Sequence, residues 1–290
     1  MQILFFMPLW GHEEVPFASF ANNTKRAGFD GIEMHLPTSD FTRSQRAEYA
    51  KIARDYGLDI ILQHCETNEA EFSAHIDALS QRIEDFVPVR PRFINSHTGR
   101  DFFSEAENLA IIDKLEALSV EHALPIYHET HRSRFNFAAH LTANFVKARP
   151  NIKQTADFSH FCCVAETLLE DQAHNIATII PSIHHIHARV GFAQSPQVSH
   201  PHAPEHVQAL EAHIKWWLRI LEMAHARGDE YFTITPEFGP VPYMPSLPFT
   251  NAPVVSQWDT NLYMRERILM ALPASLKPKK DQHHSGYGKK

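Results

Sequence analysis

The feature that most constrains this chain is an alternation of short β-rich runs with longer helical patterns along its whole length. Each helical pattern ends at or just before a glycine or a proline, the residues that stop helices. The expected strands are residues 2–8, 31–36, 58–64, 92–96, 124–129, 152–157, 183–189 and 231–237. The expected helices are residues 16–27, 44–56, 69–86, 104–122, 136–149, 166–180, 204–227 and 256–272.

Strand–helix alternation is typical of a parallel sheet covered by helices. Eight units in 290 residues favour a closed (β/α)₈ TIM barrel over an open doubly wound sheet. A glycine-rich dinucleotide-binding turn is missing after the early strands, which agrees with this choice. With no linker visible, we predict one α/β catalytic domain over residues 1–272 and a flexible basic tail over residues 273–290.

Composition and charge exclude several classes of protein. Hydrophobic residues make up 43% of the chain and charged residues 21%, which suits a globular protein with a large core. The net charge of −7 argues against binding to nucleic acid or to anionic lipid. No apolar run is long enough to span a membrane, and residues 2–10 lack the basic start of a signal peptide. Three cysteines without a framework spacing indicate a reducing, cytoplasmic setting.

Histidine is unusually frequent, at 21 of 290 residues, which indicates binding of metal or polar substrate. In a TIM barrel the chemistry lies at the carboxyl ends of the strands. Four consecutive expected strands end on side chains able to bind a metal, namely Glu129, Asp157, His187 and Glu237. Alternation along the strands turns all four toward the barrel interior. Ordinary strand-end caps or ion pairs would explain any one of these residues, but not the whole series.

Three carboxylates that converge without a cation would repel one another. We therefore expect one divalent metal ion among these four residues. Carboxylates with one imidazole suit a hard or borderline ion, with Mn²⁺ as the first choice and Co²⁺, Mg²⁺ or Zn²⁺ as alternatives.

This series resembles the metal site of the xylose-isomerase-like TIM barrels, a superfamily of sugar phosphate isomerases and epimerases that also includes inosose dehydratase and endonuclease IV. The resemblance extends over about residues 1–272, and the run GFDGIEM at residues 28–34 matches the usual second-strand pattern. It implies that Glu129 and Glu237 bind metal and also move protons at the carbon beside a carbonyl. A divalent ion would polarise that carbonyl and stabilise the enediolate.

Several other polar or aromatic residues near strand ends are expected to bind substrate. They are Trp10, Glu33, His35, His64, His97, His160 and Arg189. His64 and His97 also leave open a second metal, and an ion pair is the alternative for Arg189. The segment after the seventh expected strand, residues 191–203, is rich in proline and histidine and has the composition of an active-site loop.

We therefore predict a metal-dependent sugar isomerase or epimerase that acts on a small sugar or keto-sugar by proton transfer. A lyase or dehydratase acting on a keto-sugar or an inosose is the nearest alternative, because the same site would serve. A zinc phosphodiesterase like endonuclease IV is less favoured, since no aspartate follows the seventh strand where that enzyme needs one. A non-catalytic sugar-binding barrel is a further alternative. Trp216 and Trp217 suit a core or a subunit interface, which leaves a homo-oligomer open.

Overall fold

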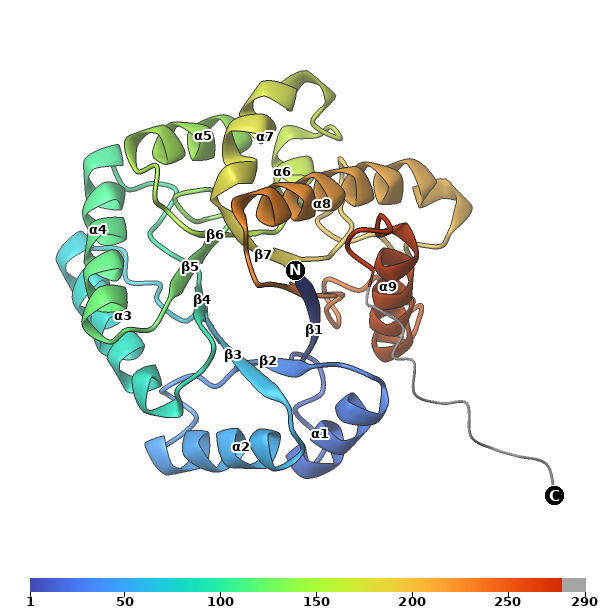
Figure 1. The fold of residues 1–290 in the computed structure, drawn as a ribbon, viewed down its shortest axis with the longest axis horizontal. Helices are drawn as coiled ribbons and strands as arrows, with labels where there is room; N and C mark the ends of the chain where they lie inside the picture. The colour runs from blue at the N-terminus through green and yellow to red at the C-terminus, as the bar shows by residue number, and fades with distance from the viewer. Residues whose placement is uncertain (278–290) are drawn as a thin grey trace.

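The computed structural model describes residues 1–277 and shows one closed ring of eight parallel strands (Figure 1). Each strand pairs with the next along the chain, and the last pairs with the first. The predicted single-domain TIM barrel is confirmed. The strands are β1 (Gln2–Pro8), β2 (Gly31–His35), β3 (Asp59–His64), β4 (Ile94–Ser96), β5 (Ile126–Glu129), β6 (Gln154–Ala156), β7 (Ile183–His187) and β8 (Tyr231–Thr235).

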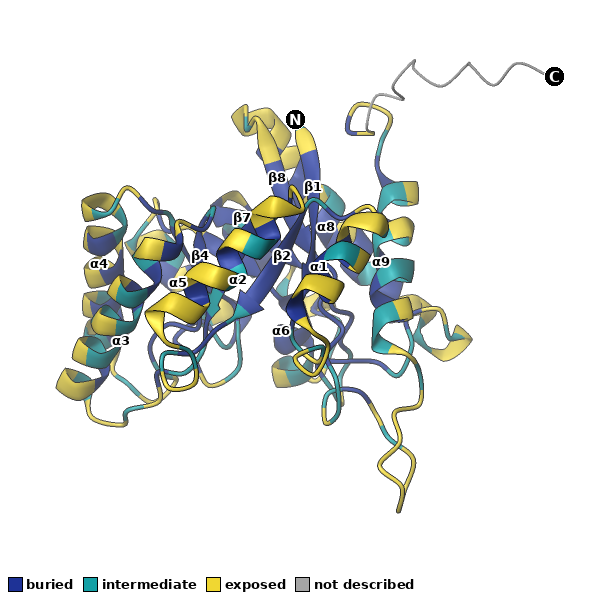
Figure 2. Cartoon of the chain, turned by 90° about the horizontal axis from the view of Figure 1, so that it is seen from below, coloured by how far each residue is buried: buried dark blue, intermediate teal, exposed yellow. Residues whose placement is uncertain are grey.

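Helices surround the strands, and their outer faces are exposed while the strands are buried (Figure 2). They are α1 (Phe17–Arg26), α2 (Arg43–Asp55), α3 (Phe72–Phe86), α4 (Glu105–Glu121), α5 (Ala139–Ala148), α6 (Phe158–Ala165), α7 (Ala173–Ile179), α8 (Val207–Arg227) and α9 (Gln257–Ala271). Helix α6 was not predicted. It begins directly after β6, where the Asp157 side chain accepts a hydrogen bond from the Ser159 amide as an N-cap.

The core of the described residues consists of three apolar clusters, of which the two larger ones position the site. Outside the ring, one large apolar cluster fills the space between strands and helices. Inside the ring, an apolar plug fills the half of the barrel nearest the strand starts; it consists of Leu4, Phe6, Ile61, Phe93 and Tyr127. Beyond this plug the interior side chains become polar toward the strand ends. The polar site therefore rests on an apolar floor.

The predicted tail is only partly described. Leu276 is buried, and its amide donates a hydrogen bond to the carbonyl of Pro273. The first residues beyond α9 thus pack against the core, which differs from the expectation of a flexible segment starting at residue 273. The rest of that prediction, residues 278–290, lies outside the described residues. Among the helices of the described part of the chain, none is both long and apolar enough to cross a membrane.

Candidate active site

The four expected metal ligands converge at the strand ends. Glu129 ends β5, Asp157 follows β6, His187 ends β7, and Glu237 lies two residues beyond β8. All four are buried, and one ligand atom from each lies within 4.8 Å of the others. We call these residues the four-ligand cluster. Alternation of side chains along parallel strands is sufficient to produce this convergence.

Two buried atoms of the cluster indicate that it fits a cation. His187 Nδ1 lies 2.8 Å from Glu237 Oε2 and 3.5 Å from Glu129 Oε2. Yet His187 Nδ1 and Glu237 Oε2 have no hydrogen-bond partner in the described part of the chain. Close atoms without hydrogen-bond geometry are what a shared metal ion requires, since ligand atoms point at the ion rather than at each other. Oxygen and imidazole donors in this ratio suit Mn²⁺, Co²⁺, Mg²⁺ or Zn²⁺.

The ring of His187 is oriented from below by Glu33. His187 Nε2 lies 2.9 Å from Glu33 Oε1. The other Glu33 oxygen lies 3.3 Å from His185 Nε2 and accepts a hydrogen bond from the hydroxyl of Thr235. This carboxylate occupies the barrel interior between the apolar plug and the four-ligand cluster. Such a partner fixes which imidazole nitrogen faces a metal.

Asp157 is held by a cation as well as by helix α6. Its Oδ2 accepts a hydrogen bond from the guanidinium of Arg189, while its Oδ1 accepts from the Ser159 amide at 3.1 Å. Arg189 also donates to Nε2 of His160 at 2.8 Å. Its guanidinium carbon lies 4.6 Å from the ring centre of Tyr243, within the range of a cation–π contact. The predicted ion-pair alternative for Arg189 is therefore present.

Burial and neighbouring charge shift the ionisation of the cluster. Burial raises the pKa of Asp157 to about 6 against the pull of Arg189, and Glu237 adds to the rise. Burial would also raise the pKa of Glu129, but His97 and His187 hold it well below its usual range. Burial opposes the charged form of His187, yet nearby carboxylates raise its pKa well above the ordinary value. A bound divalent ion would replace the proton of His187 as the balancing charge.

A pocket of about 220 Å³ opens over this cluster. Glu129 and Glu237 form part of its surface. Of the residues expected to bind substrate, four line the pocket: Trp10, His35, His97 and Arg189. The pocket therefore joins the two carboxylates to imidazole, guanidinium and indole groups, all of which can contact a polyhydroxylated molecule.

Three residues expected to bind substrate lie elsewhere. Glu33 lies beneath His187, and His160 lies behind Arg189. His64 is fully buried on the outer face of β3, where its nitrogens contact the hydroxyls of Ser96 and Thr67 at 3.0 and 2.7 Å. His64 was expected to face the pocket, but the alternation of side chains along β3 turns it outward. Ile61 belongs to the interior plug, so the inward residue near the end of β3 is residue 63.

The sequence analysis overlooked that inward residue, Gln63. Its amide nitrogen lies 3.4 Å from Glu129 Oε2 and 3.4 Å from Glu237 Oε1, so it connects the two carboxylates across the pocket. Tyr243, in the segment after β8, was also overlooked. Its ring meets Trp10 edge to face, with 5.2 Å between ring centres. Residues two apart in a strand share a face, so an inward Ile61 predicts an inward Gln63. No sequence pattern predicted that Tyr243 would lie at the pocket.

The extra histidines only partly support a second metal. His97 Nε2 lies 3.2 Å from Glu129 Oε2, and His131 stacks on His97 with ring centres 4.2 Å apart. These three residues have ligand atoms within 4.8 Å of one another. His64 takes no part, because it faces α3 rather than the pocket. None of residues 191–203 lines the pocket, so the expectation of an active-site loop there is not met.

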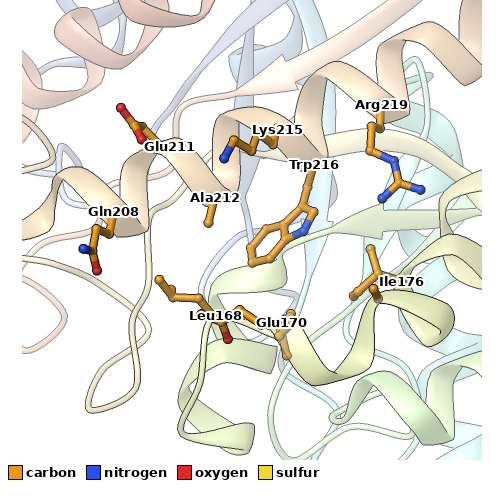
Figure 3. Close-up of a pocket in the computed structure, with 11 residues that line it drawn as sticks. Leu168, Glu170, Ile176, Gln208, Glu211, Ala212, Lys215, Trp216 and Arg219 are labelled. Carbon is orange, nitrogen blue, oxygen red and sulfur yellow. The ribbon is translucent and has the colours of Figure 1, made fainter.

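A second hollow, of about 390 Å³, lies on the outer wall of the barrel (Figure 3). Residues of α8 form one side, with Trp216 pointing into the space, and Leu168, Glu170 and Ile176 form the other. It contains none of the predicted site residues. We therefore place the candidate active site at the strand ends.

Comparison with known proteins agrees with this geometry. The profile of the family described as xylose isomerase-like TIM barrel matches residues 21–240. The chain belongs to this family. A search of curated proteins finds no match. The matched region contains every member of the four-ligand cluster.

Solved structures with the same fold include enzymes with different reactions. A 3-keto-D-glucoside 4-epimerase from E. coli is 10% identical with a TM-score of 0.59, over 93% of this chain and 100% of that one. A D-psicose 3-epimerase from Clostridium cellulolyticum H10 is 13% identical with a TM-score of 0.56, over 93% and 96%. A probable 3-DHS dehydratase from Bacillus anthracis is 18% identical with a TM-score of 0.53, over 82% and 93%. Similarity at this level shows the fold alone.

Proposed function

We propose that this xylose isomerase-like barrel is a divalent-metal-dependent isomerase or epimerase of a sugar or keto-sugar. The observation that carries the proposal is the placement of Glu129 and Glu237. Both carboxylates belong to the four-ligand cluster and also form the surface of the pocket. They come from β5 and from the segment after β8, three strands apart in the ring. A substrate between them would meet a carboxylate on each side.

The proposed reaction is proton transfer beside a carbonyl. The metal ion, most suitably Mn²⁺, would polarise the carbonyl and so make the neighbouring C–H acidic. One of the two glutamates removes that proton, and the substrate becomes an enediolate. If the other glutamate returns a proton to the opposite face of the same carbon, the product is an epimer. Return of a proton to the adjacent carbon gives an aldose–ketose isomer.

Other residues of the chain contact these carboxylates or form the wall of the pocket. Gln63 lies within reach of both and can hold their orientation. Arg189 is bound to Asp157, so it stabilises the cluster and also presents its remaining surface to the pocket. Trp10 and Tyr243 form an aromatic wall that can cover the apolar face of a sugar ring.

A dehydratase on the same site is the second candidate. Loss of a hydroxyl from the carbon next to the enediolate needs a proton donor near the leaving group. His97 meets this need, because its Nε2 is buried beside Glu129 without a hydrogen-bond partner among the described residues. Product analysis separates the two candidates, since only dehydration gives a product that has lost one molecule of water.

The experiment is hydrogen exchange with solvent. Candidate ketoses, their phosphates and inososes are incubated with the enzyme and Mn²⁺ in D₂O and followed by NMR. Deuterium at the carbon beside the carbonyl is expected, because a proton held by a carboxylate exchanges with water. Turnover with full retention of the original hydrogen would contradict the proposal and indicate a hydride shift.

Variants assign the roles of the two glutamates. Glu237→Gln is expected to abolish the exchange, and calorimetry with Mn²⁺ shows whether the variant still binds metal. Glu13→Gln is the control, because Glu13 also lines the pocket but lies outside the four-ligand cluster. Exchange at the original rate in a metal-bound Glu237→Gln protein would exclude Glu237 as an acid/base group.

A further inference from the structure

Another group of ligand-type side chains lies beside the pocket, outside the four-ligand cluster. His35 ends β2, and Cys65 and Glu66 directly follow β3. One ligand atom from each residue lies within 4.8 Å of the other two. His35 and Cys65 line the pocket, and all three side chains are half-buried. We call these residues the rim cluster.

The geometry of the rim cluster fits a small tetrahedral ion. His35 Nε2 donates a hydrogen bond to Glu66 Oε2 at 3.1 Å, and a metal ion would replace the shared proton. Nitrogen and oxygen ligands at about 2.0–2.1 Å from a tetrahedral zinc ion lie about 3.3 Å apart. The Glu66 carboxylate is also held in place, because it accepts hydrogen bonds from the amides of Thr38 and Cys65 at 3.4 and 3.3 Å.

The donor set differs from that of the four-ligand cluster. A thiol, an imidazole and a carboxylate together prefer Zn²⁺ or Co²⁺ to the harder Mn²⁺ or Mg²⁺. Cys65 is a free cysteine, so its sulfur is available as a ligand. Its carbonyl accepts a hydrogen bond from Arg134 at 3.1 Å, which fixes the backbone that carries it.

We propose that the rim cluster is a second metal site, which binds one Zn²⁺ or Co²⁺ through Cys65 Sγ, His35 Nε2 and the Glu66 carboxylate. Three protein ligands leave one coordination position open to water or to a molecule in the pocket. Binding forms a metal–sulfur bond and releases the thiol proton of Cys65 to solvent. The ion also takes the place of the proton that His35 shares with Glu66.

The test uses cobalt, because only a cobalt ion bound to thiolate gives a sulfur-to-metal charge-transfer band in the near ultraviolet. The full-length protein is stripped with a chelator, saturated with Mn²⁺ and titrated with Co²⁺. We expect the band to appear and to reach the intensity of one thiolate-bound cobalt per chain, at between one and two equivalents, because Co²⁺ also competes with Mn²⁺ for the four-ligand cluster. The band does not depend on the proposed sugar chemistry. Cobalt bound to the four-ligand cluster does not contribute to it, because that cluster has no sulfur ligand.

Cysteine variants assign the band. Cys65→Ser is expected to abolish it, whereas Cys163→Ser is expected to retain it. Cys163 is a matched control, because it is also a free and half-buried cysteine. His35→Gln is expected to weaken the apparent affinity for Co²⁺ about tenfold or more. Circular dichroism of each variant checks that the fold is retained.

A measurement on the wild-type protein avoids variants altogether. Zn²⁺ is expected to protect Cys65 from alkylation by iodoacetamide, and to leave Cys163 unprotected, as measured by mass spectrometry of the peptides. The proposal is overturned if the wild-type protein shows no charge-transfer band, if the band persists in Cys65→Ser, or if Zn²⁺ leaves the alkylation of Cys65 unchanged.

Discussion

His187 Nε2 lies 2.9 Å from the carboxylate of Glu33, while Nδ1 on the other side of the ring lies 2.8 Å from Glu237. The first contact leaves Nδ1 as the nitrogen that faces the four-ligand cluster. We therefore propose that Glu33 acts through His187 as a positioning residue. This differs from the substrate contact that the sequence suggested for it.

Replacing Glu33 with Gln should weaken metal binding while leaving the fold intact. The amide lacks the negative charge that orients the imidazole, and loss of such a partner costs about 10–100-fold in metal affinity. Calorimetric titration with Mn²⁺ measures the effect, with Glu13→Gln as the control. An unchanged affinity in Glu33→Gln would show that the negative charge of Glu33 is not needed to orient the ring.

Gln63→Leu tests the bridge between the two proposed acid/base groups. Hydrogen bonds to charged groups contribute about 1.5–3 kcal/mol, and the two bonds of Gln63 are long at 3.4 Å. We therefore expect kcat to fall about tenfold, with little change in KM or in Mn²⁺ affinity. Steady-state kinetics together with calorimetry give these values. A change confined to KM would instead make Gln63 a substrate-binding residue.

His213 on α8 should make the protein sensitive to acid. Its Nε2 accepts a hydrogen bond from the Gly191 amide at 3.3 Å, and its Nδ1 donates to the carbonyl of Ala209 at 2.9 Å. Only the neutral ring can make both bonds. Burial lowers the pKa of His213 to about 4 from its usual 6.5.

Below about pH 6.5, His213 therefore binds a proton in the unfolded chain, whereas in the folded chain it stays neutral down to about pH 4. The free energy of unfolding should fall from about pH 6.5 down to about pH 4, by about 1.4 kcal/mol per pH unit for this residue. Urea unfolding across this range measures the slope. His213→Gln should flatten it by one proton relative to the wild type. Equal slopes in the two proteins would contradict the assignment.

Gly31→Ala should destabilise the barrel. A β-carbon at this position would lie 2.2 Å from the ring of Phe6 and 2.6 Å from the carbonyl oxygen of Asp59. Overpacking of this kind costs about 1–3 kcal/mol in the free energy of unfolding. Phe6→Leu in the same chain should recover part of the loss, so the two changes should not be additive. Strict additivity in urea unfolding would argue against the contact.

The fold and the four-ligand cluster could be predicted because both depend on local periodicity. Eight strand–helix repeats determine a closed ring, and alternation within strands turns Glu129, Asp157, His187 and Glu237 inward. The same alternation, counted from the inward Ile61, predicts that His64 faces outward. His64 was expected at the pocket only because histidine is a common binding residue. The partners of Glu33 and Arg189 were beyond sequence reasoning, since they depend on contacts between side chains from different strands.

The carboxylates of the pocket and its aromatic residue Tyr243 lie at different distances from the strands of the ring. Glu129 ends β5 and Glu237 lies two residues beyond β8, so the ring places both carboxylates, whereas Tyr243 lies eight residues beyond β8 in the connecting segment. A lineage could therefore lengthen, shorten or exchange the segment that carries Tyr243 and keep the two proposed acid/base glutamates. Preference for a substrate would then drift independently of the chemistry. The same division gives an engineer a place to start a library, at residues 240–256, without changing the four-ligand cluster.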